Sequence, residues 1–139
     1  MPGTDGVALT ASPEVVAADA ETAATLAAVE RFNDAFGRHD VDAIMAAMTD
    51  DCLFESTSPP DGRQFVGQAA VRSAWESFFR SSPDAAFETE ELFAAGDRCV
   101  IRWRYQWVDP QGQPGHIRGV DLFRARDGKV AEKLAYVKG

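Results

Sequence analysis

The sequence predicts one α+β domain, in which three helices pack against a curved antiparallel sheet and close around an apolar pocket. Three observations support this fold class. The chain has 139 residues, 45% of them hydrophobic, which is enough to bury a single core. Apolar residues repeat at helical spacing in the first part of the chain, and strand-like segments fill the second part. Helices followed by antiparallel strands are the order typical of α+β proteins.

The N-terminal part is expected to be a flexible leader followed by two helices. Residues 1–20 mix Gly, Pro, Ala and acidic residues with little periodicity, so the domain is expected to occupy residues 21–139. A helix is predicted from about residue 20 to Gly37, where glycine is a natural stop. Asp40 is placed to cap a shorter second helix, which residues 49–51 end.

A strand at residues 52–57, a loop at 58–62 and a third helix at about 67–80 come next. Proline and glycine mark the loop, and an apolar stripe marks the helix. Four strands follow, at residues 86–95, 98–108, 116–125 and 129–137. Because turn residues separate these strands, we expect an antiparallel meander.

The charge of the chain argues against two classes of partner. The formal net charge is −8, and lysines and arginines are scattered singly, whereas nucleic-acid binders carry basic patches. No apolar run approaches the roughly 18 residues of a membrane span. The N-terminus has no basic region followed by an apolar one, so we expect a cytoplasmic protein with neither a nucleic-acid nor a membrane partner.

The sequence also gives no reason to expect a metal or a cofactor. Cys52 and Cys99 lie far apart inside predicted strands, so we expect two buried reduced thiols. His39 is expected at a helix boundary as a cap or surface residue, and His116 is expected to point outward with Arg118. Two isolated histidines do not make a metal site, and no glycine-rich phosphate motif is present.

Four stretches together resemble a known family. They are residues 29–36 (VERFNDAF), 39–44 (HDVDAI), 65–72 (FVGQAAVR) and 119–130 (GVDLFRARDGKV). In this order, over about residues 22–139, the chain resembles the SnoaL-like polyketide cyclase branch of the nuclear transport factor 2-like superfamily, with ketosteroid isomerase as a more distant relation. The resemblance implies a cone-shaped half-barrel with an internal pocket. It implies less about function, because this fold hosts many activities.

Strand alternation predicts which side chains line the pocket. On the 98–108 strand, Ile101, Trp103, Tyr105 and Trp107 share one face, which is the natural interior. Tyr105 could donate a hydrogen bond to a carbonyl group, or all these aromatics could be plain core. The rest of the predicted lining is Phe32, Phe36, Phe54, Ser56, Trp75 and Phe123.

Asp121 is the strongest candidate for chemistry, because it is an acidic residue inside an otherwise apolar strand. Burying a carboxylate costs free energy unless the group has a partner. The resemblance implies a general acid/base, as in SnoaL-type cyclases, or a protonated donor to an oxyanion, as in ketosteroid isomerase. We predict Asp121, Lys133 and Tyr105 as catalytic residues; a structural Asp121–Lys133 ion pair is the alternative. Phe32 and Ser56 stand where ketosteroid isomerase has its tyrosine and its base, so a steroid-isomerase mechanism is not expected.

The position of Lys133 depends on the hairpin turn at residues 126–128. A two-residue turn would pair Arg126 with Lys129 and turn Lys133 outward. A three-residue loop would pair Ala125 with Lys129 and place Lys133 opposite Asp121. The resemblance calls for the three-residue loop, which is therefore our prediction.

The sequence thus predicts a small-molecule-binding protein. It would bind a small apolar carbonyl or aromatic compound and carry out cofactor-free proton transfer, as in an aldol-type cyclisation or an isomerisation. A non-catalytic ligand-binding domain or a dimeric interaction domain is the alternative. A homodimer is expected through the outer sheet face, which carries Arg102, Arg104, Gln106, Leu134 and Tyr136.

Overall fold

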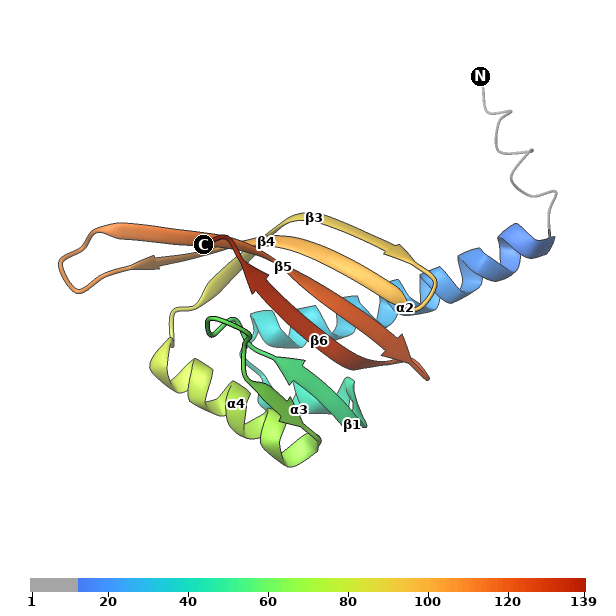
Figure 1. The fold of residues 1–139 in the computed structure, drawn as a ribbon, viewed down its shortest axis with the longest axis horizontal. Coiled ribbons are helices and arrows are strands. Elements are labelled where there is room, and N and C mark those ends of the chain that lie inside the picture. The colour runs from blue at the N-terminus through green and yellow to red at the C-terminus, as the bar shows by residue number, and fades with distance from the viewer. Residues whose placement is uncertain (1–12) are drawn as a thin grey trace, which may run out of the picture.

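A computed structural model describes residues 13–139 and confirms an α+β fold (Figure 1). The described helices are α2 (Pro13–Gly37), α3 (Val41–Ala46) and α4 (Gln68–Ser81). The strands are β1 (Met48–Glu55), β2 (Gln64–Val66), β3 (Ala86–Ala95), β4 (Arg98–Val108), β5 (Pro114–Arg126) and β6 (Lys129–Val137). None of the described helices is long and apolar enough to span a membrane.

The six strands form one open sheet in the order β2-β1-β6-β5-β4-β3. The β1–β6 pair is parallel and the other four pairs are antiparallel. Helix α2 packs against β3, β4, β5 and β6, while α4 packs against β1 and β2. Both helices lie on the same side of the sheet, so the side chains on that face, the inner face, meet the helices (Figure 1).

Several boundaries and one short strand differ from the sequence-based expectations. Residues 49–51, expected to end the second helix, lie in β1, and β5 begins at Pro114 rather than at residue 116. Helix α2 begins at Pro13, within the segment expected to be a leader; alanine has the highest helix propensity and proline suits the first helical turn. Residues 1–12, the rest of that segment, lie outside the described part of the chain. Strand β1 starts at Met48 rather than Cys52, because Met48 already pairs with Val130 of β6. The three-residue strand β2 was not predicted.

The start of α3 agrees with the prediction. Asp40 caps this helix, and its Oδ1 accepts a hydrogen bond of 3.1 Å from the Ala43 N–H. Just before it, His39 adopts a left-handed backbone with φ 57°. The His39 Nε2 lies 3.0 Å from the Ala85 carbonyl oxygen, and its ring stacks on Phe79 at 4.2 Å. His39 therefore joins the end of α2 to the segment that leads into β3.

The turn between β5 and β6 corrects the predicted three-residue loop. Arg126 pairs with Lys129, so Asp127 and Gly128 form a two-residue turn. Both have positive φ, 53° and 76°, as a type I′ turn requires. Asp-Gly is among the sequences that favour this turn, so the local chemistry prevails over the register that the resemblance implied.

A β-bulge in β6, two residue pairs after the turn, directs Lys133 back to the inner face. Ala125 pairs with Val130, but Arg124 pairs with Glu132, so Ala131 is an extra residue on β6. A one-residue shift moves every later side chain to the other face. Lys133 therefore lies on the inner face, as predicted, but it pairs with Phe123 and not with Asp121, because neither of the predicted registers forms.

The core fills the space between the helices and the inner face. Its largest fully buried side chains are Trp75, Phe32, Phe123, Ile44, Met48, Ile101, Val29, Val71, Val130, Cys52 and Cys99. The two cysteines are free and buried, as the sequence predicts. Burial, with a smaller contribution from the charge of Glu30, raises the pKa of the Cys99 thiol to about 11.

Candidate functional site

A cavity of about 1000 Å³ lies between α2, α4 and the inner face of the sheet. Ten of the predicted site residues line it: Phe32, Phe36, Phe54, Ser56, Trp75, Trp103, Tyr105, Trp107, Asp121 and Lys133. Phe123 does not line it, because its fully buried ring packs against Phe32 with centroids 5.6 Å apart. The aromatic side chains that line the cavity come from α2, β1, β2, α4, β3 and β4.

Sequence reasoning missed several lining residues on neighbouring elements. Phe78 lies on the apolar stripe that predicted α4, and Phe87 lies across from Tyr105 on β3. The ring centroids of Phe87 and Tyr105 are 4.8 Å apart. Alternation along β3 could have found Phe87, whereas Arg63, in the loop before β2, carries no comparable signal.

Two glycines on β5 make room for the tryptophans of β4. Trp103 pairs with Gly119, and Trp107 pairs with Gly115. A Cβ atom on Gly119 would lie 2.6 Å from Cζ2 of Trp103, and one on Gly115 would lie 2.6 Å from Cε2 of Trp107. Both indoles therefore lie against the glycines of β5, where a side chain would displace them.

Asp121 lies on β5 between Ile101 of β4 and Ala135 of β6, and only 8% of it is exposed. Its Oδ2 is 3.6 Å from Nζ of Lys133. Burial raises the pKa of the Asp121 carboxyl, and the nearby Lys133 and Trp103 only partly oppose this shift. Asp121 thus holds a proton more readily than an exposed aspartate does.

Lys133 is equally buried and sits among aromatic rings. Its Nζ lies 5.0 Å from the ring centroid of Phe36, 5.2 Å from that of Phe54 and 5.1 Å from that of Trp75. These distances are within the range of cation–π attraction. Rings from α2, β1 and α4 therefore hold the amine of Lys133 beside Asp121.

Two indole N–H groups on the cavity wall near Asp121 and Lys133 make no hydrogen bond. Among the described residues, the Nε1 atoms of Trp75 and Trp103 are buried and have no hydrogen-bond partner. The Trp103 N–H lies close enough to Asp121 to lower its pKa, but not in the geometry of a hydrogen bond. Buried N–H groups without partners are rare in folded proteins, so this end of the cavity has unmet donors.

Tyr105 and Ser56 line the cavity but are not brought next to Asp121 in the same way. Tyr105 pairs with Ile117, four residues before Asp121, which is about 13 Å along a strand. The Ser56 Oγ accepts a hydrogen bond of 3.1 Å from the Arg63 N–H. Asp121 and Lys133 are therefore the close pair among the predicted catalytic residues.

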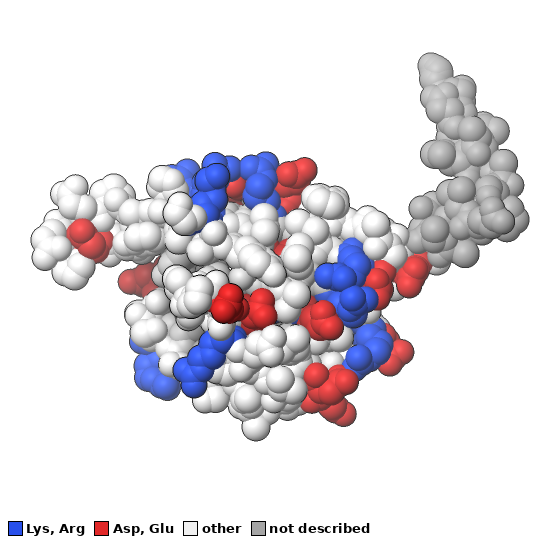
Figure 2. Space-filling model, viewed as in Figure 1, with Lys and Arg blue, Asp and Glu red and all other residues white. Residues whose placement is uncertain are grey.

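The opposite face of the sheet, the outer face, carries exposed ion pairs. Arg118 points outward, as predicted, and its Nη2 lies 2.9 Å from Glu90. Arg102 lies 3.2 Å from Glu91 through its Nε. Figure 2 shows acidic and basic side chains close together at several places on the surface in view. Within residues 13–139, no group of three or more His, Cys, Asp or Glu residues could hold a metal ion.

Comparison with known proteins gives one family and one fold. The model of a family described as SnoaL-like domain matches residues 29–133. A nuclear transport factor 2-like protein of unknown function from Mesorhizobium loti is 39% identical, with a TM-score of 0.73, and the match covers 86% of this chain and 94% of that one. No curated protein matches this chain.

Two more distant solved structures share the fold. A putative polyketide cyclase from Xanthomonas campestris pv. campestris has a TM-score of 0.66 and 21% identity, over 85% of this chain and 93% of that one. A putative ketosteroid isomerase from Kribbella flavida has a TM-score of 0.72 and 18% identity, over 86% of this chain and 81% of that one.

Proposed function

Because this chain belongs to the SnoaL-like family and has the nuclear transport factor 2-like fold, we propose that its cavity binds a small apolar carbonyl or aromatic compound, and that Asp121 transfers a proton to or from that compound. No cofactor is needed for such a step. The names of the distant relatives, a polyketide cyclase and a ketosteroid isomerase, agree with chemistry that begins by enolising a carbonyl compound.

The observation that carries this proposal is the buried Asp121 on the cavity wall. Its raised pKa brings the carboxyl closer to the pH at which an acid/base catalyst works well. As the acid it would donate a proton to a carbonyl oxygen, and as the carboxylate it would remove a proton from the adjacent carbon. Aldol-type cyclisation and isomerisation both pass through the enol or enolate formed in this way.

Lys133 is proposed to stabilise the enolate oxygen. The distance of 3.6 Å between its Nζ and Asp121 is longer than the 2.7–2.9 Å of a charge-assisted hydrogen bond, so the amine has room for a second acceptor. A cation fixed beside a developing oxyanion stabilises the transition state more than the ground state. Tyr105 and Ser56 would contact the parts of the compound that lie farther from Asp121.

The test combines a binding measurement with an exchange measurement. A panel of aromatic ketones and 1,3-diketones is first ranked by the rise in melting temperature that each compound causes. The compound that stabilises most is then dissolved in D₂O with the protein, and NMR follows deuterium incorporation next to its carbonyl group. We expect exchange above the uncatalysed rate, and a loss of about 10²–10⁴-fold in Asp121→Asn.

Asp127→Asn is the matched control, since Asp127 lies in the exposed turn of the same hairpin and outside the cavity. It should exchange like the wild type. Unchanged exchange in Asp121→Asn would show that Asp121 is not the acid/base. A panel in which no compound stabilises the protein would contradict the proposed binding function itself.

A non-catalytic ligand-binding protein is the second candidate. It is favoured by the Asp121–Lys133 ion pair, because a nearby amine stabilises the carboxylate and so weakens a neutral acid. This candidate predicts compounds that stabilise the wild-type protein yet show no catalysed exchange. The same experiment therefore separates the two functions.

We also propose that the outer face joins two copies of the chain. An apolar row crosses it, in which Phe93 pairs with Val100, Val100 with Leu122 and Leu122 with Leu134. Phe93 is 55% exposed, an unusual position for a large aromatic ring. Light scattering after gel filtration should show a dimer for the wild type and a monomer for Leu122→Lys. An unchanged mass would contradict this interface.

A further inference from the structure

The end of the cavity beside Asp121 and Lys133 holds more hydrogen-bond donors than acceptors. The Lys133 amine has up to three N–H groups, and the indoles of Trp75 and Trp103 have one each. The carboxyl of Asp121 is the neighbouring acceptor, and its contact with Lys133 is 3.6 Å long. Within the described residues neither indole N–H has a partner. An acceptor from outside the chain would satisfy these donors.

The charge of the lining favours the same kind of acceptor. The charged residues that line the cavity are Arg63, Asp121 and Lys133, which gives one excess positive charge. The whole chain has a formal net charge of −8, so its cavity is cationic while its sequence is strongly acidic. A cleft whose charge differs from the rest of the surface raises the local concentration of oppositely charged ligands. Here those ligands are anions.

The rings around Lys133 define the rest of the ligand. Phe36, Phe54 and Trp75 surround its amine, and all three also line the cavity. Such walls bury apolar and aromatic surface, and they exclude water from the polar groups. A polar group of the ligand that enters this end must then find partners on the protein. A flat aromatic compound with one oxygen-rich acidic end satisfies both requirements.

We propose that the cavity selects aromatic compounds that carry an anionic oxygen group, either a carboxylate or an ionised phenol or enol, and that Lys133 and the Trp103 indole N–H bind this group. The proposal rests on the proposed binding function and adds the chemical class of the ligand. Nothing in it requires that the ligand be turned over.

Asp121 has a definite part in this recognition. As a carboxylate it would repel a bound anion, whereas as a neutral acid it would donate a third hydrogen bond. Asp121→Asn removes the repulsion and keeps an N–H donor, so this variant should bind anions more tightly than the wild type.

The test uses two compounds with the same rings and different charge, naphthalene-2-carboxylate and naphthalene-2-carboxamide. Isothermal titration calorimetry at pH 7.5 gives the affinity of the full chain for each. We expect the wild type to prefer the carboxylate by about tenfold or more, which corresponds to one hydrogen bond to a charged group. Lys133→Met should bring the preference close to one, and Trp103→Phe should reduce it while keeping an aromatic ring.

Lys129→Met is the matched control, because it makes the same change at an exposed position at the start of the same strand. It should retain the preference of the wild type. Equal affinities for the two compounds in the wild type would overturn this inference and leave the proposed binding function intact. If neither compound binds, the inference is overturned, while the proposed function is decided separately by the panel of ketones and 1,3-diketones.

Circular dichroism first establishes that each variant is folded. A folded Lys133→Met that still prefers the carboxylate would overturn the assignment of Lys133. If Lys133→Met does not fold, Asp121→Asn decides instead. A rise in its preference for the carboxylate supports the proposal, and an unchanged preference overturns it.

Discussion

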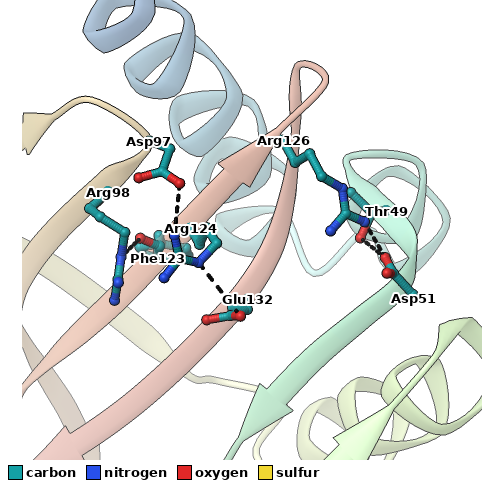
Figure 3. Close-up of polar contacts among 8 residues, drawn as sticks. All are labelled: Thr49, Asp51, Asp97, Arg98, Phe123, Arg124, Arg126 and Glu132. Carbon is teal, nitrogen blue, oxygen red and sulfur yellow. Dashed lines mark hydrogen bonds and ion pairs between the residues drawn. The ribbon is translucent and has the colours of Figure 1, made fainter.

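The two faces of the sheet carry ion pairs made by neighbouring residues of β5 and β6. On the inner face, Asp121 meets Lys133 at 3.6 Å, and both are about nine-tenths buried. On the outer face, Arg124 lies 2.7 Å from Asp97 and 3.6 Å from Glu132, as Figure 3 shows. The outer contacts are partly exposed, so water and salt screen them.

The comparison shows that burial decides what an ion pair does. Lys133 and Glu132 are adjacent in sequence, yet the pleat sends one into the cavity and the other to solvent. On the outer face, Asp97 and then Glu132 favour the charged form of Arg124 and so raise its pKa, whereas in the buried pair the cost of desolvation raises the pKa of the acid. The buried pair exists because the bulge at Ala131 turns Lys133 toward the inner face, where Asp121 lies.

The largest difference is expected when one partner of each pair is removed. Lys133→Met leaves the Asp121 carboxyl buried without its amine, which should lower the free energy of unfolding by about 3–5 kcal/mol at pH 7. Arg124→Met, on the outer face, should change the stability very little. Urea denaturation monitored by circular dichroism measures both.

The double variant Lys133→Met/Asp121→Asn sharpens this test. It removes both charges, so most of the lost stability should return. If the double variant is as unstable as Lys133→Met, the loss comes from packing rather than from the unpaired acid. Equal losses in Lys133→Met and Arg124→Met would contradict the difference between the faces.

A packing change on the inner face should have the next largest effect. Gly119→Ala would place a Cβ atom 2.6 Å from Cζ2 of Trp103 and against the Tyr136 carbonyl oxygen. Because these atoms are buried, we expect a loss of about 1–3 kcal/mol in the free energy of unfolding and a shifted tryptophan fluorescence. Gly37→Ala, where nothing lies within 4 Å of the added atom, is the control and should keep the wild-type stability. Equal stability of the two variants would mean that the indole of Trp103 can move freely.

Two aspartates, Asp121 on the inner face and the exposed Asp51, should change the stability of the protein with pH in opposite directions. The pKa of Asp121 is raised, mainly by burial, so its contribution is present below about pH 4 and is lost as the pH rises. The pKa of Asp51 is lowered, first by the Thr49 hydroxyl and then by Arg126, so its contribution is lost as the pH falls (Figure 3).

Melting temperatures between pH 3.5 and 7 test this pair. Relative to the wild type, Asp121→Asn should gain stability as the pH rises, and Asp51→Asn should lose it. The other acids titrate in all three proteins, so the differences isolate the two aspartates. Curves that run parallel to the wild type for Asp121→Asn would show that burial does not shift its pKa.

The sequence predicts the helices and long strands well, because their apolar periodicity records which side faces the core. The same alternation places Trp103 and Asp121 on the inner face. It gives the face of a residue and not its depth, which is why Phe123 was expected in the cavity and is instead covered by Phe32. The strand β2 is too short, at three residues, to show any period.

The register of the β5–β6 hairpin shows a different limit. The Asp127-Gly128 dipeptide specifies a two-residue turn, and that local signal alone points Lys133 to solvent. The bulge at Ala131 reverses the outcome, and it depends on packing: Val130 and Ala131, consecutive residues, are both buried. The turn sequence does not predict this bulge, so the position of Lys133 beside Asp121 could be found only from the structure.

The smallest expected effect is the reactivity of the two cysteine thiols, which lie in the core beyond the cavity wall. Cys99 lies on the inner face of β4 and Cys52 lies on β1, yet neither lines the cavity. Burial raises the pKa of both thiols, that of Cys99 to about 11, so at pH 8 almost no thiolate forms. Ellman's reagent at pH 8 should therefore label neither cysteine in the native protein and both in 6 M guanidinium chloride. Rapid labelling of Cys99 in the native state would mean that the cavity opens past Ile101 into the core. Water would then reach the inner face, which contradicts the burial that raises the pKa of Asp121.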